Sequence, residues 1–231
     1  MKHVPVMTID GPSGSGKGTV SRAAAHALGW ALLDSGALYR LVALAARQQG
    51  ASLEDGPRLA ALAEHLDLKF GSDAAGGEVI WLDGREVTGA IRTEEAGSDA
   101  SKVAALPVVR AALLERQRRF AVAPGLVADG RDMGTVVFPQ AEVKIFLTAS
   151  AAERAARRHK QLKEKGVAAT LAALSLEIAE RDRRDTNRAI SPLVPSADAI
   201  LLDTTGMSVD EVVERVLLEA RERLSAELCR K

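Results

Sequence analysis

One stretch near the start of the chain constrains the fold more than any other, the run GPSGSGKGT at positions 11–19. An apolar run at 4–9 precedes it and a helical pattern at 20–28 follows it. The order strand, glycine-rich loop, helix is typical of a phosphate-binding loop, in which backbone N–H groups and the positive end of the helix surround a polyphosphate. A glycine-rich turn with a solvated lysine is the alternative, and the agreement of strand, loop and helix argues against it. We expect nucleotide phosphates to be held by Gly11, Pro12, Ser13, Gly14, Ser15, Gly16, Lys17, Gly18 and Thr19.

The position after the loop lysine departs from the general pattern, which has Ser or Thr there. This chain has Gly18 and then Thr19. A hydroxyl next to the lysine normally reaches Mg²⁺, so either Thr19 takes that place or the metal is held largely through water. Asp129 ends another apolar run, and a carboxylate in that position is the expected partner of Mg²⁺ or its waters.

Apolar runs and helical patterns alternate along most of the chain, which predicts an α/β fold. Helices between consecutive strands indicate an open, five-stranded parallel sheet with helices on both faces. Strands are expected at 4–9, 30–33, 126–129, 143–147 and 199–203. Helices are expected at 17–28, 37–48, 93–106, 108–120, 151–165, 170–182 and 208–228. Pro107 suits the first turn of its helix, and Ser208 with Glu211 forms a capping box.

The pattern of apolar residues changes between residues 66 and 91. Short apolar runs at 68–70, 79–82 and 85–87 predict strands, and Asp83-Gly84 is a hairpin signal between the last two. The stretch therefore predicts an antiparallel insertion in an otherwise alternating chain. It could be a surface excursion or a mobile flap over a substrate, and the residues leave both open.

Arginines concentrate on the helical hairpin at 151–182 and in the run RDRRDTNR that follows at 181–188. Arginine clamps stabilise the charge that spreads over a transferring phosphoryl group. The alternative is an exposed helix pair laced by charge pairs. Because a phosphate-binding loop lies upstream, we favour a lid over about 150–188.

Charge and composition exclude several classes of protein. Lys and Arg together balance Asp and Glu at 31 each, and aromatic residues make up 3% of the 231 residues. A neutral chain with few aromatics offers neither a basic field nor a stacking platform for nucleic acid, and no field for an anionic membrane. The single cysteine, Cys229, excludes a disulfide framework. With neither a signal peptide nor a membrane-spanning run, we expect a cytoplasmic protein, and without an obvious dimer face, a monomer.

Four motifs together resemble the bacterial cytidylate kinases, nucleoside monophosphate kinases that phosphorylate CMP and dCMP with ATP. They are IDGPSGSGKGT at 9–19, LDSGALYR at 33–40, ADGRDMGTVVFP at 128–139 and ERDRRDTNR at 180–188. The resemblance implies a P-loop kinase fold in a single domain, with ATP and Mg²⁺ as cofactors. Its core would comprise 1–60, 107–149 and 189–231, its monophosphate-binding insertion 61–106 and its lid 150–188.

The resemblance also implies roles for individual residues, with Lys17 and the loop on the ATP phosphates. The lid arginines expected on the ATP side are Arg157 and Arg158. The residues that would hold the acceptor's phosphate are Arg40, Arg131 and Arg188. Those near the sugar would be Ser35, Arg181 and Asp185. Those that would read cytosine are Ser101, Arg110 and Asp132. The catalytic set would be Lys17, Asp129, Arg131 and Arg188.

Elementary chemistry supports the cytosine assignment. Cytosine presents an amino group where uracil presents a carbonyl, so a carboxylate such as Asp132 can accept from the first and faces an acceptor in the second.

Three rival functions remain: a kinase for another acceptor such as UMP, AMP or shikimate, a nucleotide-dependent switch, and a nucleic-acid-binding module. The switch would need a guanine-reading Asn-Lys-x-Asp, and the one asparagine, Asn187, is followed by Arg188. At the end of the second strand, Asp34, Ser35 and Arg40 are expected where a second ligand could lie beside the phosphate-binding loop. Asp34 or Ser35 could instead cap the helix, and the two roles can coexist.

Overall fold

A computed structural model describes residues 3–72, 78–164 and 166–228. Cys229 and Lys165, the expected last residue of a helix, lie outside these ranges. The chain divides into two compact units, Met1–Asp34 with Arg118–Lys231, and Ser35–Gln117, and each is described by itself. Within the described ranges, no helix combines the length and the apolar character that a membrane span requires.

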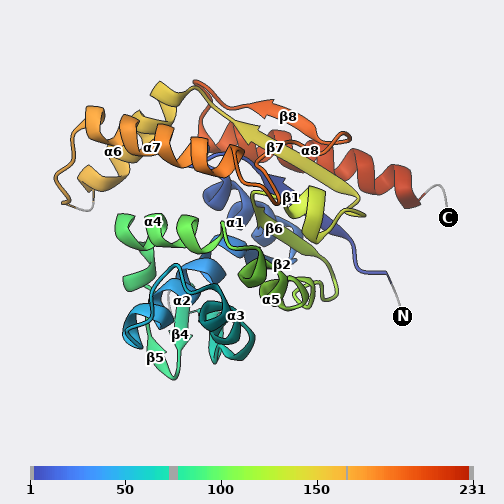
Figure 1. Cartoon of the computed structure of the whole chain (residues 1–231). Helices are drawn as coiled ribbons and strands as arrows, with labels where there is room; N and C mark the ends of the chain where they lie inside the picture. Colours follow the sequence, from blue (N-terminus) through green and yellow to red (C-terminus); the bar gives the residue numbers. More distant parts are fainter. Residues whose placement is uncertain (1–2, 73–77, 165, 229–231) are drawn as a thin grey trace. The chain divides into compact units, whose positions relative to one another are not determined.

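The first unit is built on the predicted parallel sheet (Figure 1). Its strands stand in the order β2-β6-β1-β7-β8, and every neighbouring pair is parallel. The strands are β1 (Val6–Asp10), β2 (Ala31–Asp34), β6 (Leu126–Gly130), β7 (Val143–Thr148) and β8 (Ile200–Asp203). Since β1 is central and leads into the glycine-rich loop, the loop lies at the carboxyl edge of the sheet, where such sheets bind ligands.

One face of this sheet is covered by α1 (Lys17–Leu28) and α8 (Val209–Leu228) (Figure 1). Met7 and Ile9 of β1 point into this layer and are fully buried against residues of both helices. Burying each such side chain stabilises the fold by about 1.5–3 kcal/mol. The predicted capping box opens α8, because Ser208 Oγ accepts from the Glu211 amide at 3.3 Å and the Glu211 carboxylate accepts from the Ser208 amide at 2.8 Å.

The opposite face carries η2 (Met133–Val137), a π-helical turn that the sequence did not predict. Thr8 and Asp10 alternate with the core residues of β1 and therefore face this turn. A Cβ at Gly134 would lie 2.9 Å from Thr8 Oγ1, so the turn approaches the strand as closely as a glycine allows. Helical elements thus lie on both faces, as predicted.

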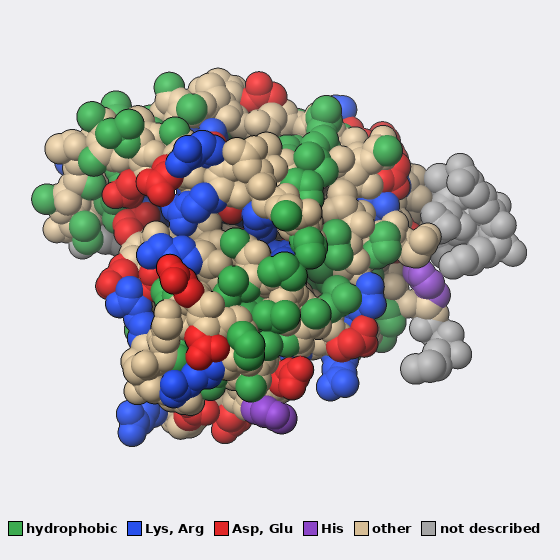
Figure 2. Space-filling model, viewed as in Figure 1, with side chains coloured by type: hydrophobic (Ala, Val, Ile, Leu, Met, Phe, Trp, Pro, Cys, Tyr) green, Lys and Arg blue, Asp and Glu red, His purple; other side chains and the backbone are tan. Residues whose placement is uncertain are grey.

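Two helices of the first unit, α6 (Ala151–Glu164) and α7 (Leu171–Thr186), lie side by side as the predicted hairpin. The expected end of the second helix at 182 is wrong, because α7 continues to Thr186. No glycine or proline interrupts residues 181–186, and Arg184 pairs with Glu180 one turn earlier, so the run of charges supports the helix instead of ending it. Hydrophobic side chains gather at the free end of the pair, with Val167, Leu171 and Leu176 exposed (Figure 2).

The second unit contains the predicted antiparallel sheet, in the order β3-β4-β5. Asp83 and Gly84 turn its hairpin with positive φ angles of 50° and 73°. The strands are β3 (Leu68–Ser72), β4 (Glu78–Leu82) and β5 (Arg85–Glu86). The helices are α2 (Ser35–Gln48), α3 (Gly56–His65), the 3-10 turn η1 (Ala90–Arg92), α4 (Glu94–Val103) and α5 (Pro107–Arg118), whose last residue belongs to the first unit.

Helix α3 was not predicted, although it carries a recognisable start signal. The Asp55 carboxylate accepts from the Arg58 amide at 3.2 Å, and Pro57 follows within the first turn. Asp-Gly-Pro suits a turn as well as a helix start, so only the apolar spacing downstream separates the two.

Candidate active site

The glycine-rich loop has a backbone that side chains could not follow. Gly11 has φ +147°, and a Cβ there would lie 2.0 Å from the carbonyl oxygen of Leu147. Gly14 and Gly16 have φ of +77° and +92°. Gly16 caps α1 without a side chain, so the first amides of the helix face the loop, an arrangement that suits an anion.

Lys17 lies buried inside the loop with its ammonium group turned onto it. Nζ donates to the Pro12 carbonyl at 2.7 Å and lies 3.5 Å from Ser15 Oγ. Burial, assisted by the charge of Arg131, lowers the pKa of Lys17 from 10.5 to about 7. The negative charges nearby, including Asp129, do not compensate for lost hydration. A polyphosphate would supply the missing negative charge.

Arg154 of α6 joins the loop to the helical pair, and the sequence analysis assigned it no role. Its guanidinium donates to the Ser13 carbonyl at 2.9 Å and to the Ala149 carbonyl at 3.1 Å. Its third nitrogen, Nη2, lies 2.6 Å from Asp182 Oδ2 on α7. The Arg154 side chain is 7% exposed and that of Asp182 is 24% exposed, so the arginine is desolvated and its partner is partly exposed. Its place in the first turn after β7, a strand adjacent to β1, is the signal that could have singled it out.

The two lid arginines predicted on the ATP side lie differently. Arg157 Nη1 donates to Thr204 Oγ1 at 2.9 Å and approaches the Ser15 carbonyl at 3.4 Å, and Nη2 donates to the Thr204 carbonyl. It therefore holds the loop against the segment after β8. Arg158 instead donates to Gln161 on its own helix.

Two of the predicted acceptor-site arginines come together around the carboxylate of a third predicted residue. Asp185 of α7 is buried, and its Oδ2 accepts from Arg131 Nε at 2.9 Å. Arg188 Nη2 lies 3.7 Å from its other oxygen, and Arg188 Nε donates to its carbonyl at 3.2 Å. Burial alone would raise the pKa of Asp185, but the charges of Arg131, Arg188 and Arg181 outweigh it and hold the pKa below its usual range. The arrangement fixes two guanidinium groups that a phosphate could engage.

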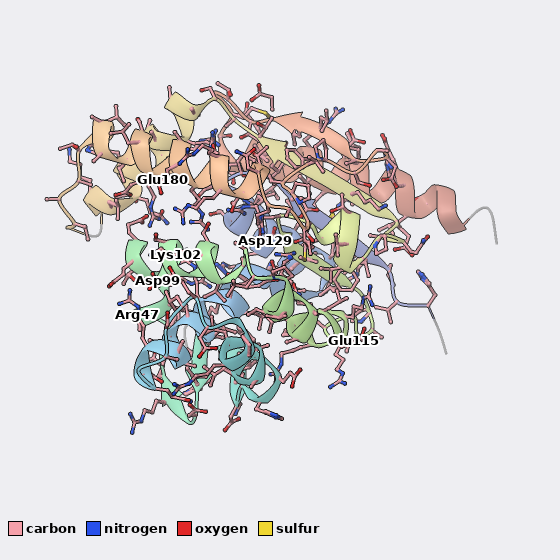
Figure 3. The ribbon with its side chains drawn as sticks, viewed as in Figure 1. Arg47, Asp99, Lys102, Glu115, Asp129 and Glu180 are labelled. Atoms are coloured by element: carbon pink, nitrogen blue, oxygen red, sulfur yellow. The ribbon has the colours of Figure 1, made fainter. Side chains whose placement is uncertain are left out.

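The residues predicted to hold Mg²⁺ lie near the start of α1. A Cβ at Gly18 would lie 3.4 Å from Asp129 Oδ2, which places the carboxylate at the end of β6 against the turn that carries Thr19 (Figure 3). Across the described ranges, no three His, Cys, Asp or Glu side chains gather as a metal site. A carboxylate and a hydroxyl fit a magnesium ion that takes its other ligands from water and phosphate.

Asp10 and Asp132 are two buried carboxylates on the opposite side of β1 from the core. Asp132 directly precedes η2. Asp10 accepts hydrogen bonds from the amides of Met133 at 2.9 Å and Gly134 at 2.8 Å. Burial raises the pKa of Asp10 from 3.8 to about 7, although both amides oppose the shift. The sequence analysis treated Asp10 only as the end of a strand.

The remaining predicted residues lie in the second unit, with Ser35 buried at the start of α2. Arg40 Nη1 donates to the carbonyls of Ile91 at 2.6 Å and Thr93 at 3.1 Å, next to the start of α4. Thr93 caps that helix by accepting from the Ala96 amide at 3.1 Å. Arg40 is thereby held at the end of α4.

Two further predicted residues lie on α4 and on α5. Ser101 is buried on α4. Arg110 is buried as well, donates to the Ala104 carbonyl at 3.2 Å, and stacks 5.6 Å from the centre of the Tyr39 ring. Asp99, 3% exposed, pairs with Arg47 and Lys102, so an ion-pair group fastens α4 to α2 (Figure 3).

A parallel sheet with a glycine-rich loop, a buried loop lysine and arginines held by carboxylates defines a P-loop phosphotransferase. The family model for cytidylate kinase matches residues 7–222. The cytidylate kinase of Stutzerimonas stutzeri (strain A1501) is 62% identical, covering 96% of this chain and 98% of its own. Those of Marinomonas sp. (strain MWYL1) and Shewanella denitrificans (strain OS217 / ATCC BAA-1090 / DSM 15013) are 60% and 56% identical, covering 93% and 97% of this chain and 95% and 99% of their own. The chain belongs to the cytidylate kinase family.

Proposed function

We propose that the protein transfers the γ-phosphoryl group of ATP to CMP and dCMP, giving ADP with CDP or dCDP. The observation that carries the proposal is a pair of positively charged places in the first unit. One is Lys17 inside the phosphate-binding loop, and the other is the pair Arg131 and Arg188 held by Asp185. A kinase for a phosphorylated acceptor needs both, one for the donor's polyphosphate and one for the acceptor's phosphate.

The chemistry requires no general base, because the acceptor phosphate is already anionic at neutral pH. Catalysis then consists of alignment and of stabilising the charge on the transferred group. Lys17, Arg131 and Arg188 supply the positive charge. When bound, Mg²⁺ would neutralise charge on the ATP phosphates, and Thr19 and Asp129 would hold it directly or through water.

The remaining roles follow from family membership and stay proposals. Arg40 joins the arginines on the acceptor's phosphate, and Arg157 and Arg158 act on the ATP side. Ser35, Arg181 and Asp185 serve the sugar, with Asp185 also fixing the arginines it bonds. Asp132, Arg110 and Ser101 read cytosine, since a carboxylate accepts from its amino group and would face a carbonyl in uracil.

The proposed organisation follows the same logic. Residues 150–188 act as a lid and 61–106 as the monophosphate-binding insertion, and their closure excludes water that would otherwise hydrolyse ATP. We propose that the protein works in the cytoplasm as a monomer, with small nucleotides as its partners and neither nucleic acid nor a membrane.

The test is ADP release from ATP and Mg²⁺ with CMP, dCMP, UMP, AMP or no acceptor. Fast turnover with CMP and dCMP alone supports both the reaction and the cytosine-reading set. Preference for another monophosphate keeps phosphoryl transfer but discards the roles of Ser101, Arg110 and Asp132. Turnover that ignores every acceptor contradicts the proposal.

A further inference from the structure

Asp10 joins two parts of the first unit that the proposed mechanism uses for different substrates. It is the last residue of β1, and the phosphate-binding loop begins at the next residue. Asp10 is 6% exposed, and each of its two carboxylate oxygens accepts from one amide, that of Met133 at 2.9 Å and that of Gly134 at 2.8 Å. Those amides belong to the residues that directly follow Arg131 and Asp132.

A two-oxygen contact of this kind fixes orientation as well as position. Two successive peptide planes must both present their N–H groups to one rigid, planar carboxylate. Asp132 has φ −145° and ψ 25°, outside the regular helix and strand regions, and its backbone is held on one side by the first hydrogen bonds of η2 and on the other by the amides that Asp10 accepts from. The direction of its side chain therefore depends on where the next two amides are held.

The same turn also approaches the side chains on this face of the sheet closely at Gly134. A Cβ added to Gly134 would lie 2.9 Å from Thr8 Oγ1 and 3.3 Å from Lys144 Cδ. The turn can come close enough for the Asp10 carboxylate only because residue 134 has no side chain. A two-oxygen acceptor and a glycine thus together hold one short segment against this face of β1.

An aspartate is an unfavourable choice here if a fold contact were all that was needed. Its charge is removed from water, and the charges of Asp129 and Asp132 oppose it further. Asparagine would fit the space, but its amide offers one acceptor oxygen, and its NH₂ group would meet the second N–H. A carboxylate satisfies both amides.

We propose that Asp10 is a positioning residue that sets Arg131 and Asp132 for the acceptor while anchoring the start of the donor's loop. What those two residues bind rests on the proposed function. Asp10 itself touches no substrate. Its influence on the acceptor passes through the backbone of residues 133 and 134. Losing Asp10 should therefore raise KM for CMP, which a general loss of stability would not do.

The test compares four variants of the full chain by steady-state kinetics, with CMP and ATP varied separately. Asp10→Ala removes both acceptors, Asp10→Asn keeps one, and Gly134→Ala disturbs the same segment by adding a Cβ that would crowd Thr8 and Asp10. Val216→Ala is the control, because Val216 is fully buried in the core between α8 and the sheet and touches none of these residues. Unfolding temperatures are measured for all four.

We expect Asp10→Ala to raise KM for CMP by about tenfold or more, the loss that unsatisfied buried amides produce, with Asp10→Asn between it and the unaltered protein. Both changes remove the same charge near Lys17, so any change in KM for ATP should be equal in the two. Gly134→Ala should raise KM for CMP, and Val216→Ala should lower the unfolding temperature while leaving KM for CMP within about twofold of that of the unaltered protein.

An unchanged KM for CMP in Asp10→Ala, or an equal rise in Val216→Ala, overturns the inference. If Asp10→Ala does not fold, the comparison of Asp10→Asn with Val216→Ala decides. Failure of the proposed function is distinguishable, because the unaltered protein would then show no CMP-dependent turnover. In that case amide hydrogen exchange at Met133 and Gly134 still decides: it must accelerate in Asp10→Asn more than in Val216→Ala, and equal rates contradict the contact's role.

Discussion

Arg154 and Asp182 form an ion pair, with Nη2 2.6 Å from Oδ2, that joins α6 to α7 while the same guanidinium holds the carbonyl of Ser13 in the phosphate-binding loop. One side chain thereby connects the proposed lid to the loop that would hold ATP. Because Arg154 is removed from water, its positive charge must be neutralised within the protein, and the Asp182 carboxylate does this.

Asp182 has no assigned contact with ATP. Replacing it by Asn should nevertheless weaken ATP binding, because Arg154 would lose its partner. We expect KM for ATP to rise by about three- to tenfold and stability to fall by roughly 1–2 kcal/mol, less than for a fully buried pair because Asp182 is partly exposed. Steady-state kinetics and urea unfolding measure both. Glu180→Gln, which removes a mostly exposed partner of Arg184, is the matched control and should leave both unchanged. A KM for ATP equal to that of the unaltered protein would contradict the connection.

Lys17 makes the free protein less stable than it could be. Its folded pKa of about 7 lies below 10.5, so between these values the folded state binds fewer protons than the unfolded state, and stability contributed at this site rises with pH. Below pH 7 Lys17 is protonated in both states, so the full cost of burying its charge remains. Lys17→Met should remove this slope, stabilise the free protein at neutral pH, and abolish ATP binding. Urea unfolding at several pH values and calorimetric titration with ATP test it, and a less stable variant would refute it.

Asp10 should give the opposite dependence at lower pH. Its folded pKa is raised from 3.8 to about 7, so between these values the folded state binds more protons than the unfolded state. The stability contributed by this group is therefore present at low pH and is lost as pH rises toward 7. Asp10→Asn should flatten the stability curve between about pH 4 and 7. An unchanged slope in that range would show that Asp10 is ionised throughout.

Glu78 and Arg92 tie β4 to η1 within the second unit, beside the carbonyls that hold Arg40. Losing this ion pair should loosen those carbonyls, so we expect Glu78→Gln to raise KM for CMP by about two- to fivefold with little change for ATP. The pair is partly exposed, which keeps the effect small. The charge-reversed double variant, Glu78→Arg with Arg92→Glu, should recover part of the loss. Additive losses in that double variant would argue against coupling through the pair.

The parallel sheet, the loop and the antiparallel hairpin could be predicted because each has a local signal. Gly11, Gly16 and the pair Asp83-Gly84 adopt backbone angles that their residue types permit, and β1 is a mostly apolar run that ends at Asp10. Local signals mislead where two structures share them, as at the start of α3, whose Asp-Gly-Pro also suits a turn.

The parts that escaped prediction depend on contacts between distant segments. The π-helical turn η2 is held to β1 by the bond from the Gly134 amide to Asp10, two residues far apart in the sequence. The sequence does not distinguish Arg154 from the neighbouring arginines, and only the fold shows that it contacts the Ser13 carbonyl. Asp185 was expected near the sugar, and its bonds to Arg131 and Arg188 could not be derived from spacing. The roles assigned to the site residues remain predictions for the experiments above.

The bond between Arg157 and Thr204 has a consequence for the order in which the protein becomes functional. Thr204 follows β8, and its hydroxyl in turn donates to the Thr148 carbonyl at 3.0 Å, so a late segment of the chain completes the surroundings of a loop made at the very beginning. During synthesis the glycine-rich loop leaves the ribosome long before Thr204. Arg157 can therefore be held between the loop and Thr204 only after most of the chain has been made. In the nascent chain Arg157 therefore cannot make its bonds to Thr204 until the segment after β8 has been synthesised and has joined the sheet.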